Sequence, residues 1–331
     1  MRDRDAAKPQ SLAWRLGALA VQRFHHQDAK IAKKDSPPQH SGHLTASLPL
    51  WLAFAISLFA LPVAAEPALW VVTSGGATIH LFGTIHVLKS KTAWETPKIA
   101  AAFRESQELW LELDDADPAA MQPLVAELGI DRAHPLSTKL AAADVPRLEA
   151  AAILAGLPGE AALEPMRPWL AALTLGTLPI IRAGYDPAKG VDQVLKAKAA
   201  AVGKPVHGLE TAAQQMHFFA DLPQATQVEF LRSVLDEVAD GPATIAAILE
   251  AWSKGDLAAL DKNLNELTEQ NYRELYAILI VNRNRAWAGR IAERLKSGPG
   301  VTFMAVGTAH LVGRDSLQKA LEERGISVAR E

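Results

Sequence analysis

The amino-acid sequence predicts an α/β fold, in which a central mixed β-sheet takes strands from both ends of the chain and carries a large inserted helical lobe. Two observations lead to this prediction. Apolar runs of strand length lie within residues 69–113 and return at 301–329. Between about residues 118 and 295, the chain is instead rich in Ala and Leu, with apolar residues at helical spacing. Strands on both sides of a helical middle favour a single sheet built from distant segments.

The N-terminal part of the sheet is predicted from three apolar runs. Residues 69–73 and 77–82 flank a Ser-Gly-Gly sequence, which is a hairpin signal. A helix is expected from about residue 96 to 107. The run Glu108–Leu113 follows this helix and has the composition of a buried strand that ends in acidic residues.

The helical middle is interrupted twice before the chain returns to an α/β pattern. Apolar residues recur at helical spacing from 224 to 238 and from 272 to 287. Glycine and proline interrupt this pattern at 184–190 and 203–211, and a short strand is expected at 205–209. The C-terminus is predicted as a strand at 301–306, a helix at 315–324 and a strand at 326–329.

Composition limits the chemistry that the chain can perform. The chain has 331 residues and no cysteine, so thiolate metal ligands and cysteine nucleophiles are excluded, and any metal must be bound by His, Asp or Glu. A core of this size does not need disulfide bonds. The net charge of −3 argues against a nucleic-acid-binding protein, which would depend on an excess of basic residues.

The first 65 residues have the layout of an export signal. Residues 1–46 are basic, with eight Lys or Arg against four Asp, and are predicted to be a disordered extension. Residues 47–65 are uncharged and apolar and end in Val-Ala-Ala, which fits a Sec-type signal peptide. A membrane anchor is the alternative, but Pro62 and the small residues at the end favour cleavage. We therefore expect a periplasmic or secreted protein, or one anchored to the inner membrane, whose only membrane contact is through this segment.

A Gly-Thr-x-His motif occurs twice, at residues 83–86 and 307–310, each time directly after a predicted strand. When residues 77–88 are aligned with 301–312, the Gly, Thr and His of the two motifs coincide, and so does an earlier Thr. The copies are too far apart for a tandem repeat. We interpret them as two half-units whose strands deliver equivalent loops to one place.

The paired histidines, His86 and His310, suggest a metal site. Each projects from a loop at the carboxyl edge of the predicted sheet, where open α/β sheets place their ligands. Two converging imidazoles and a carboxylate can hold a divalent metal and leave a position for a water nucleophile. A single loop histidine is more often structural or solvated, but two matched copies favour a shared functional site.

Two glutamates are candidates for the carboxylate. Glu112 lies at the end of an apolar strand, where a carboxylate without a partner is costly to bury. Glu210 holds a comparable position after the short strand at 205–209. We expect Glu112 to be a further metal ligand or the general base, and Glu210 to orient water or substrate. For each, a helix cap or an ion pair is the alternative.

Arg283 falls on the apolar face of a predicted helix, four residues after Leu279 and four before Trp287. A buried guanidinium needs carboxylates or an anionic ligand. Stabilisation of charge on a substrate or transition state is one interpretation; the alternative is a structural ion pair or a side chain that extends its charged end to solvent. Asp192, in a polar break after an apolar helix, is interpreted as an ordinary first-turn residue of the next helix.

Together these motifs resemble those of the TraB/GumN family. Besides the two Gly-Thr-x-His motifs and Glu112, the resemblance rests on GVDQVL at 190–195, KPVHGLET at 204–211, and Arg283-Asn284 followed by Trp287. It covers residues 67–331. The family is similar to the Tiki Wnt-inactivating metalloproteases, and more distantly to erythromycin esterases and haem-binding ChaN-like proteins. The resemblance implies an α/β core with pseudo-twofold halves and a site made by His86, His310 and Glu112.

The leading functional hypothesis is an exported metal-dependent hydrolase, and kinship rather than the residues makes a peptidase the first candidate. Mn²⁺, Co²⁺ or Zn²⁺ would be held by His86, His310 and Glu112, with Glu112, Glu210 and Arg283 as catalytic groups. The substrate would be a peptide or a small molecule. One alternative is a non-catalytic periplasmic protein that binds haem, a metal or a peptide through the same histidines. Another is an accessory factor in cell-surface polysaccharide assembly, which only the association of GumN proteins suggests.

Overall fold

The computed structural model describes residues 66–113, 118–266, 269–270 and 272–331. The basic extension (1–46) and the signal-like segment (47–65) predicted from the sequence lie outside the described residues. Within the described part of the chain, no helix combines the length and the apolar composition needed to cross a membrane.

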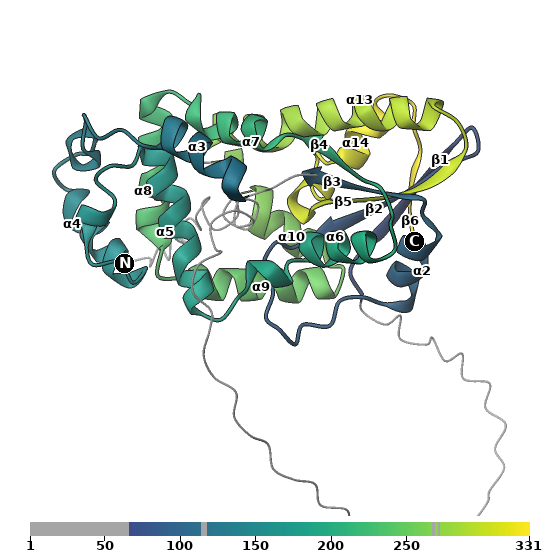
Figure 1. The fold of residues 1–331 in the computed structure, drawn as a ribbon, viewed down its shortest axis with the longest axis horizontal. Coiled ribbons are helices and arrows are strands. Elements are labelled where there is room, and N and C mark those ends of the chain that lie inside the picture. Colours follow the sequence, from purple (N-terminus) through teal and green to yellow (C-terminus); the bar gives the residue numbers. More distant parts are fainter. Residues whose placement is uncertain (1–65, 114–117, 267–268, 271) are drawn as a thin grey trace, which may run out of the picture.

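A six-stranded mixed β-sheet lies at the centre of the described chain, in the order β4-β3-β5-β2-β1-β6. The strands are β1 (Leu69–Ser74), β2 (Ala77–Thr84), β3 (Glu108–Leu113), β4 (Val206–Glu210), β5 (Gly300–Gly307) and β6 (Val328–Arg330). β2, β5, β3 and β4 run parallel, whereas β1 is antiparallel to both β2 and β6. Strand β5, from the C-terminal part of the chain, lies between β2 and β3 (Figure 1), so the sheet combines distant segments, as the sequence predicted.

Helices cover both faces of this sheet because successive side chains along each strand point to opposite faces. In β5, Phe303 and Ala305 belong to one apolar cluster, and Met304 and Val306 belong to the other. The first cluster includes residues of α2 (Pro97–Glu105), α6 (Val191–Ala201), α9 (Gly241–Ser253) and α10 (Leu257–Asp261). The second cluster includes residues of α13 (Asn282–Lys296) and α14 (Leu317–Glu322).

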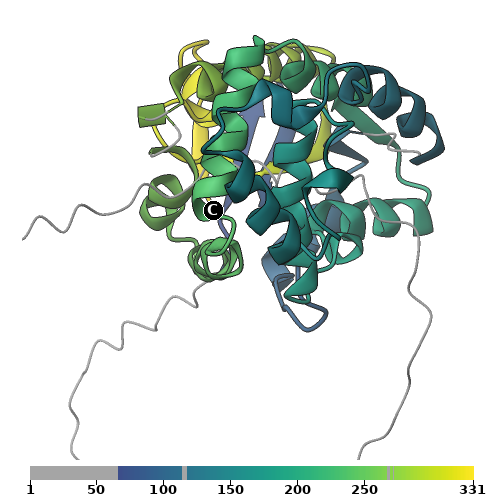
Figure 2. The ribbon, with the colours of Figure 1, turned by 90° about the vertical axis from the view of Figure 1, so that its left-hand side faces the viewer.

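A helical lobe extends from one end of the sheet (Figures 1 and 2) and has an apolar core of its own. Its main helices are α3 (Pro118–Gly129), α4 (Val145–Leu154), α5 (Pro168–Arg182), α7 (Ala212–Ala220) and α8 (Gln224–Glu237). The aromatic ring of Phe219 stacks on Trp169 on one side and on Phe230 on the other, with centroid distances of 6.1 and 5.9 Å. The inserted segment 118–295 therefore divides between this lobe and helices that cover the sheet.

Short helical segments connect these elements. They are η2 (Leu136–Lys139), η3 (Glu160–Ala162), η4 (Pro187–Lys189), η5 (Lys262–Glu266), α12 (Arg273–Tyr276), η6 (Ala277–Val281) and η7 (Thr308–Leu311). Of these, η6 is a turn of π-helix that leads without a break into α13. Such turns occur often at functional sites, because they displace the side chains that follow them.

The two Gly-Thr-x-His motifs end neighbouring parallel strands. In the sheet register, Gly83 of β2 lies opposite Val306 of β5, and Thr84 lies opposite Gly307. In the strand register the two motifs are thus offset by one residue, although their sequences align without a gap. Side-by-side strands nevertheless place both motif loops at one edge of the sheet.

Candidate functional site

The four parallel strands end at one edge of the sheet, and the residues predicted from the sequence lie at that edge. Glu112 is the penultimate residue of β3, and Glu210 is the last residue of β4. His86 follows β2 by two residues, and His310 lies in η7, directly after β5. The charge of Glu112 interacts with both imidazoles. The structure therefore brings together the two histidines and the two glutamates that the sequence singled out.

Arg283 is the centre of this cluster and is only 5% exposed. Its Nη2 donates to Glu112 Oε2 at 2.5 Å and to Glu210 Oε2 at 2.8 Å, and its Nε donates to Glu210 Oε1 at 2.8 Å. Nη1 lies 3.1 Å from Nε2 of His310. Burial alone would lower the pKa of Arg283, but the two carboxylates raise it above its ordinary value. The guanidinium is therefore a permanent positive charge inside the site.

Glu112 connects this cluster to the second Gly-Thr-x-His motif. Its Oε1 accepts a hydrogen bond from the backbone N–H of Gly307 at 2.6 Å, while Oε2 accepts from Arg283. Burial alone would raise the pKa of this carboxyl group, but the charge of Arg283, the imidazoles and the Gly307 N–H lower it to about 2. Glu112 is thus an ionised carboxylate, and hydrogen bonds occupy both of its oxygens.

Glu210 supports Arg283 from the other side. Oε1 also accepts from the indole Nε1 of Trp287 at 3.0 Å, and Oε2 accepts from Nε2 of Gln215 at 2.9 Å. The rings of Trp287 and Phe218 lie 4.7 and 5.4 Å from the guanidinium carbon. These contacts fix the Glu210–Arg283 pair in one orientation.

His86 is buried and is held by Asp192 of α6. Its Nδ1 lies 2.9 Å from Asp192 Oδ1, so the carboxylate accepts the Nδ1 proton. Burial alone would lower the pKa of His86, but the charge of Asp192 and this hydrogen bond raise it above its usual range. The other ring nitrogen, Nε2, has no hydrogen-bond partner among the described residues, and neither has the nearby Thr84 Oγ1. The structure therefore corrects the interpretation of Asp192 as merely a first-turn helix residue.

The chain around Asp192 also fixes the backbone of the first motif loop. Val191 N donates to Ile85 O at 3.0 Å, and Leu88 and Asp186 exchange two backbone hydrogen bonds. Gly190 packs so closely that a Cβ there would overlap the carbonyl of His86. A glycine is therefore needed at this position for space, not for backbone conformation.

His310 is fully buried in a different environment. Nδ1 lies 2.7 Å from Asn284 Oδ1, and Asn284 Nδ2 donates to the backbone oxygen of Asp315 at 2.7 Å. Because Oδ1 can only accept, Nδ1 carries the proton and Nε2 accepts from Arg283. Burial and the positive charge of Arg283 lower the pKa of His310 to about 3. His310 is therefore a neutral imidazole.

Comparison with known proteins identifies the family of this chain. The model of the TraB/PrgY/gumN family matches residues 68–330. The chain belongs to this family. It is 26% identical over 258 residues to the uncharacterized protein YbaP of Escherichia coli K12, a match that covers 77% of this chain and 92% of YbaP. YbaP of Shigella flexneri matches to the same extent. No solved structure matches the chain significantly.

The donor atoms at this edge, as arranged, do not fit a divalent metal. In residues 66–113, 118–266, 269–270 and 272–331, no group of three or more His, Cys, Asp or Glu is placed to hold a metal ion. Of the three expected ligands, only His86 presents a donor atom without a partner among the residues that the structure describes. Nε2 of His310 faces Arg283, and both oxygens of Glu112 accept hydrogen bonds. A metal at these ligands would require Arg283 to move.

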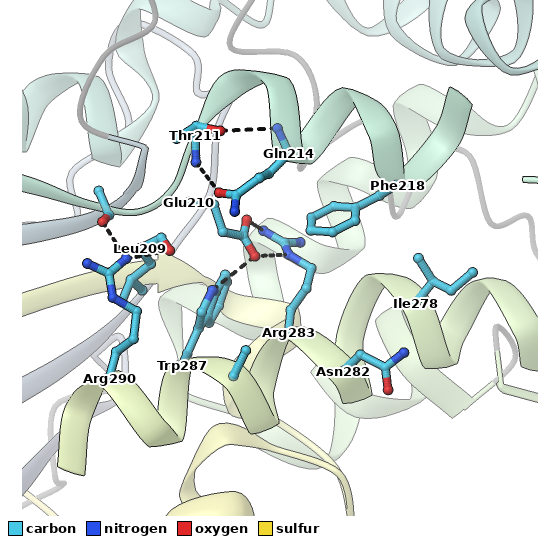
Figure 3. Close-up of a pocket in the computed structure, with 12 residues that line it drawn as sticks. Leu209, Glu210, Thr211, Gln214, Phe218, Ile278, Asn282, Arg283, Trp287 and Arg290 are labelled. Carbon is cyan, nitrogen blue, oxygen red and sulfur yellow. Dashed lines mark hydrogen bonds and ion pairs between the residues drawn. The ribbon is translucent and has the colours of Figure 1, made fainter. Parts of the chain in front are cut away.

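A pocket of about 680 Å³ reaches the site from the side of α7 and α13 (Figure 3). It is lined by Gly208, Leu209, Glu210, Thr211, Gln214, Phe218, Ile278, Asn282, Arg283, Ala286, Trp287 and Arg290. A second pocket of about 510 Å³ shares Gln214, Phe218 and Ile278 with it and continues past His217 and Asp221. Arg283 thus contacts the pocket and His310, so it lies between the pocket and that imidazole.

Four residues of the site were not assigned to it from the sequence. Asp192 and Asn284 orient the histidines, and Trp287 and Gln215 orient Glu210. Asn284 follows Arg283 directly and belongs to the motif that Trp287 completes, so the order of motifs contained a signal for both. No sequence pattern pointed to Gln215. It directly follows Gln214, whose side chain completes the capping box at the N-terminus of α7.

Proposed function

We propose that this chain is a hydrolase in which His86 is the general base and the positive charge of Arg283 stabilises the carbonyl oxygen under attack. The observation that carries the proposal is the state of His86: Asp192 holds its Nδ1, and its Nε2 has no protein partner within the described residues. A buried imidazole held in this way is arranged to take a proton at Nε2. Family membership adds no reaction, since the relatives found carry no assigned activity.

The proposed reaction assigns one step to His86 and one to Arg283. His86 Nε2 takes a proton from water as the water oxygen attacks a carbonyl carbon. The carbonyl oxygen becomes negatively charged, and the Arg283 guanidinium stabilises it. On collapse of the tetrahedral intermediate, the imidazolium returns the proton to the leaving nitrogen or oxygen. Against the effect of burial, the negative charge of Asp192 raises the pKa of His86 and so makes its imidazole a stronger base.

The substrate would enter through the larger pocket, because Arg283 and Glu210 line it, whereas both histidines are buried behind its wall. Its volume is within the range of pockets that bind small molecules or short peptide segments. Apolar walls from Phe218, Ile278 and Trp287 meet the polar pair Glu210 and Arg283. A peptide bond flanked by an apolar side chain is the substrate that this lining favours.

A metal-dependent form of the same hydrolase remains a separate proposal. It would use Mn²⁺, Co²⁺ or Zn²⁺ held by His86, His310 and Glu112. It is tested by elemental analysis of protein purified without a metal-affinity tag. The metal content of the wild type is compared with that of a His86→Ala/His310→Ala variant. One equivalent of metal in the wild type, lost in the variant, would favour this form over the metal-free one.

Hydrolysis is tested with a library of quenched fluorescent peptides and a panel of esters, using the full chain. His86→Ala should lower kcat/KM by about a hundredfold or more, because general-base catalysis contributes on that order. His217→Ala is the matched control: His217 forms a similar pair with Asp221 at 3.0 Å, but in an exposed position of the second pocket. No turnover of any substrate, or equal turnover by wild type and His86→Ala, would refute the proposal.

We also propose export, on the basis of the apolar segment 47–65 alone. Fractionation of cells that produce the full chain, with N-terminal sequencing of the product, tests this directly. A periplasmic product that begins near Glu66 is the expected result. Full-length protein confined to the cytoplasm would contradict the proposal.

A further inference from the structure

We propose that the guanidinium of Arg283 is the resident cation of this site and occupies the place that a divalent metal would need. Three side chains direct acceptor atoms at it: Glu112, Glu210 and His310. These carboxylate oxygens and this imidazole nitrogen are the donor types that bind Zn²⁺ or Mn²⁺ in proteins. In this chain all of them face one organic cation.

The spacing of the acceptors suits a guanidinium and not a metal ion. The acceptor atoms lie 2.5–3.1 Å from three different nitrogens of Arg283. A metal needs its ligand atoms at about 2.0–2.2 Å from a single point. A planar fork directs its donors outward to different points, so acceptors placed around it do not converge on one ion while Arg283 stays in place.

Charge makes the two cations alternatives. Glu112 and Glu210 supply two negative charges in a buried site, and Arg283 already supplies one positive charge. A divalent ion beside a retained guanidinium would bring three positive charges together against two negative ones. Burial of an excess of like charge is strongly unfavourable. Metal binding would therefore have to displace Arg283.

Displacement is opposed by the packing of the Arg283 side chain. The rings of Trp287 and Phe218 lie against the guanidinium, and Nη1 also donates to the backbone oxygen of Leu279 at 3.2 Å. The π turn η6 ends two residues before Arg283 and helps to set this position. The inference concerns what neutralises the carboxylates, so it holds whether or not the site hydrolyses a substrate.

The test is to remove the cation and measure metal binding. Arg283→Met keeps the length of the side chain and removes its charge. Arg290→Met is the matched control on the same helix, because Arg290 donates to the Gly208 and Leu209 carbonyls and not to a carboxylate. Mn²⁺ and Zn²⁺ are titrated by calorimetry into tag-free protein, and thermal unfolding is followed with and without each metal.

Arg283→Met is expected to bind about one equivalent of metal at least about tenfold more tightly than the wild type, because the unpaired carboxylates then need a cation. Its Tm should rise when metal is added. Wild type and Arg290→Met should show neither effect. The double variant Arg283→Met/Glu112→Gln should bind the metal about tenfold or more weakly than Arg283→Met, because it has lost a ligand group.

Two results would overturn the inference. One is a wild-type protein that takes up one equivalent of metal, with the uptake lost in His310→Ala. The other is a folded Arg283→Met that gains no metal affinity. If Arg283→Met does not fold, Arg283→Lys retains a positive charge without the fork and should exclude metal as the wild type does. Metal uptake by Arg283→Lys equal to one equivalent would then contradict the role of the charge.

Discussion

Nδ1 of His86 lies 2.9 Å from Oδ1 of Asp192, although 106 residues separate the two in the chain. This hydrogen bond joins the loop after β2 to the first turn of α6. Both side chains are buried, so the bond is shielded from water and sets the orientation of the imidazole. It leaves Nε2 as the ring nitrogen without a hydrogen-bond partner among the described residues.

Replacing this carboxylate should impair the reaction more than substrate binding. In Asp192→Asn, we expect kcat/KM to fall by about a hundredfold, chiefly through kcat, because the imidazole loses its orienting anion. Asp221→Asn, which changes the exposed His217 pair, should leave kcat/KM unchanged. Steady-state kinetics on the best peptide or ester substrate provides the measurement. Equal effects of the two substitutions would show that Asp192 does not orient a catalytic base.

The close contact of Gly190 with His86 predicts that a single added methyl group at residue 190 will destabilise the protein. Gly190→Ala would force the Cβ onto the His86 carbonyl and should lower the free energy of unfolding by about 1–3 kcal/mol. Gly289→Ala, inside α13 with only an ordinary contact at 3.8 Å, should instead raise it by about 0.5–1 kcal/mol. Urea unfolding measures both. A neutral Gly190→Ala would mean that the loop can move away from this segment.

Alternate residues of β3 meet three arginines of α13. Glu112 pairs with Arg283, Trp110 lies under Arg290 at 5.5 Å, and Glu108 pairs with Arg294. The period of two along the strand thus matches helical spacing along α13. This row of contacts holds the helix that carries Arg283 in a fixed position over the sheet.

Glu112 should be the most sensitive member of this row. Glu112→Gln preserves volume but leaves the buried Arg283 with less negative charge, and we expect it to lower the free energy of unfolding by about 3 kcal/mol. Glu250→Gln, which breaks the exposed pair with Lys254, is the control and should change stability little. Chemical unfolding at neutral pH gives both values. A loss from Glu112→Gln no larger than that from Glu250→Gln would argue against a tightly coupled buried cluster.

The Glu108–Arg294 pair predicts a dependence of stability on pH. Burial alone would raise the pKa of Glu108, but hydrogen bonds from Arg294 and Thr302 lower it below its ordinary value of 4.5. The ionised form is therefore favoured by folding, so its contribution is complete above pH 4.5 and is lost as the pH falls below that value. The Tm difference between wild type and Glu108→Gln should be largest near neutral pH and shrink below pH 4.5. A difference that grows on acidification would contradict this assignment.

The larger pocket can be tested as the entrance for substrate. Ala286 is exposed on α13 and lines this pocket, so Ala286→Phe should partly fill it and raise KM by about tenfold, equivalent to about 1.4 kcal/mol of binding energy. Ala247→Phe places the same ring on an exposed position of α9 and serves as the control. The kinetic constants of both variants decide the question. An unchanged KM in Ala286→Phe would exclude this pocket as the route of entry.

Much of the fold follows from local patterns in the sequence. The strands around the two Gly-Thr-x-His motifs were predicted within one or two residues, because apolar runs and turn glycines are local signals. The convergence of His86, His310, Glu112 and Glu210 followed from their positions at strand ends. Local signals did not show that α6 and α13 pack on the sheet, since an amphipathic helix does not specify its partner.

The sequence by itself determined that two histidines and two glutamates stand at strand ends, since residue order and apolar periodicity are sufficient for that. Only the tertiary structure decided what each of them faces. The deciding contacts join residues that are 26 to 171 positions apart in the chain: Asp192 with His86, Asn284 with His310, and Arg283 with Glu112. Hydrogen bonds of this kind form only when separate elements are placed to within a few tenths of an ångström. Their relative positions are fixed only when the helices have packed against the sheet.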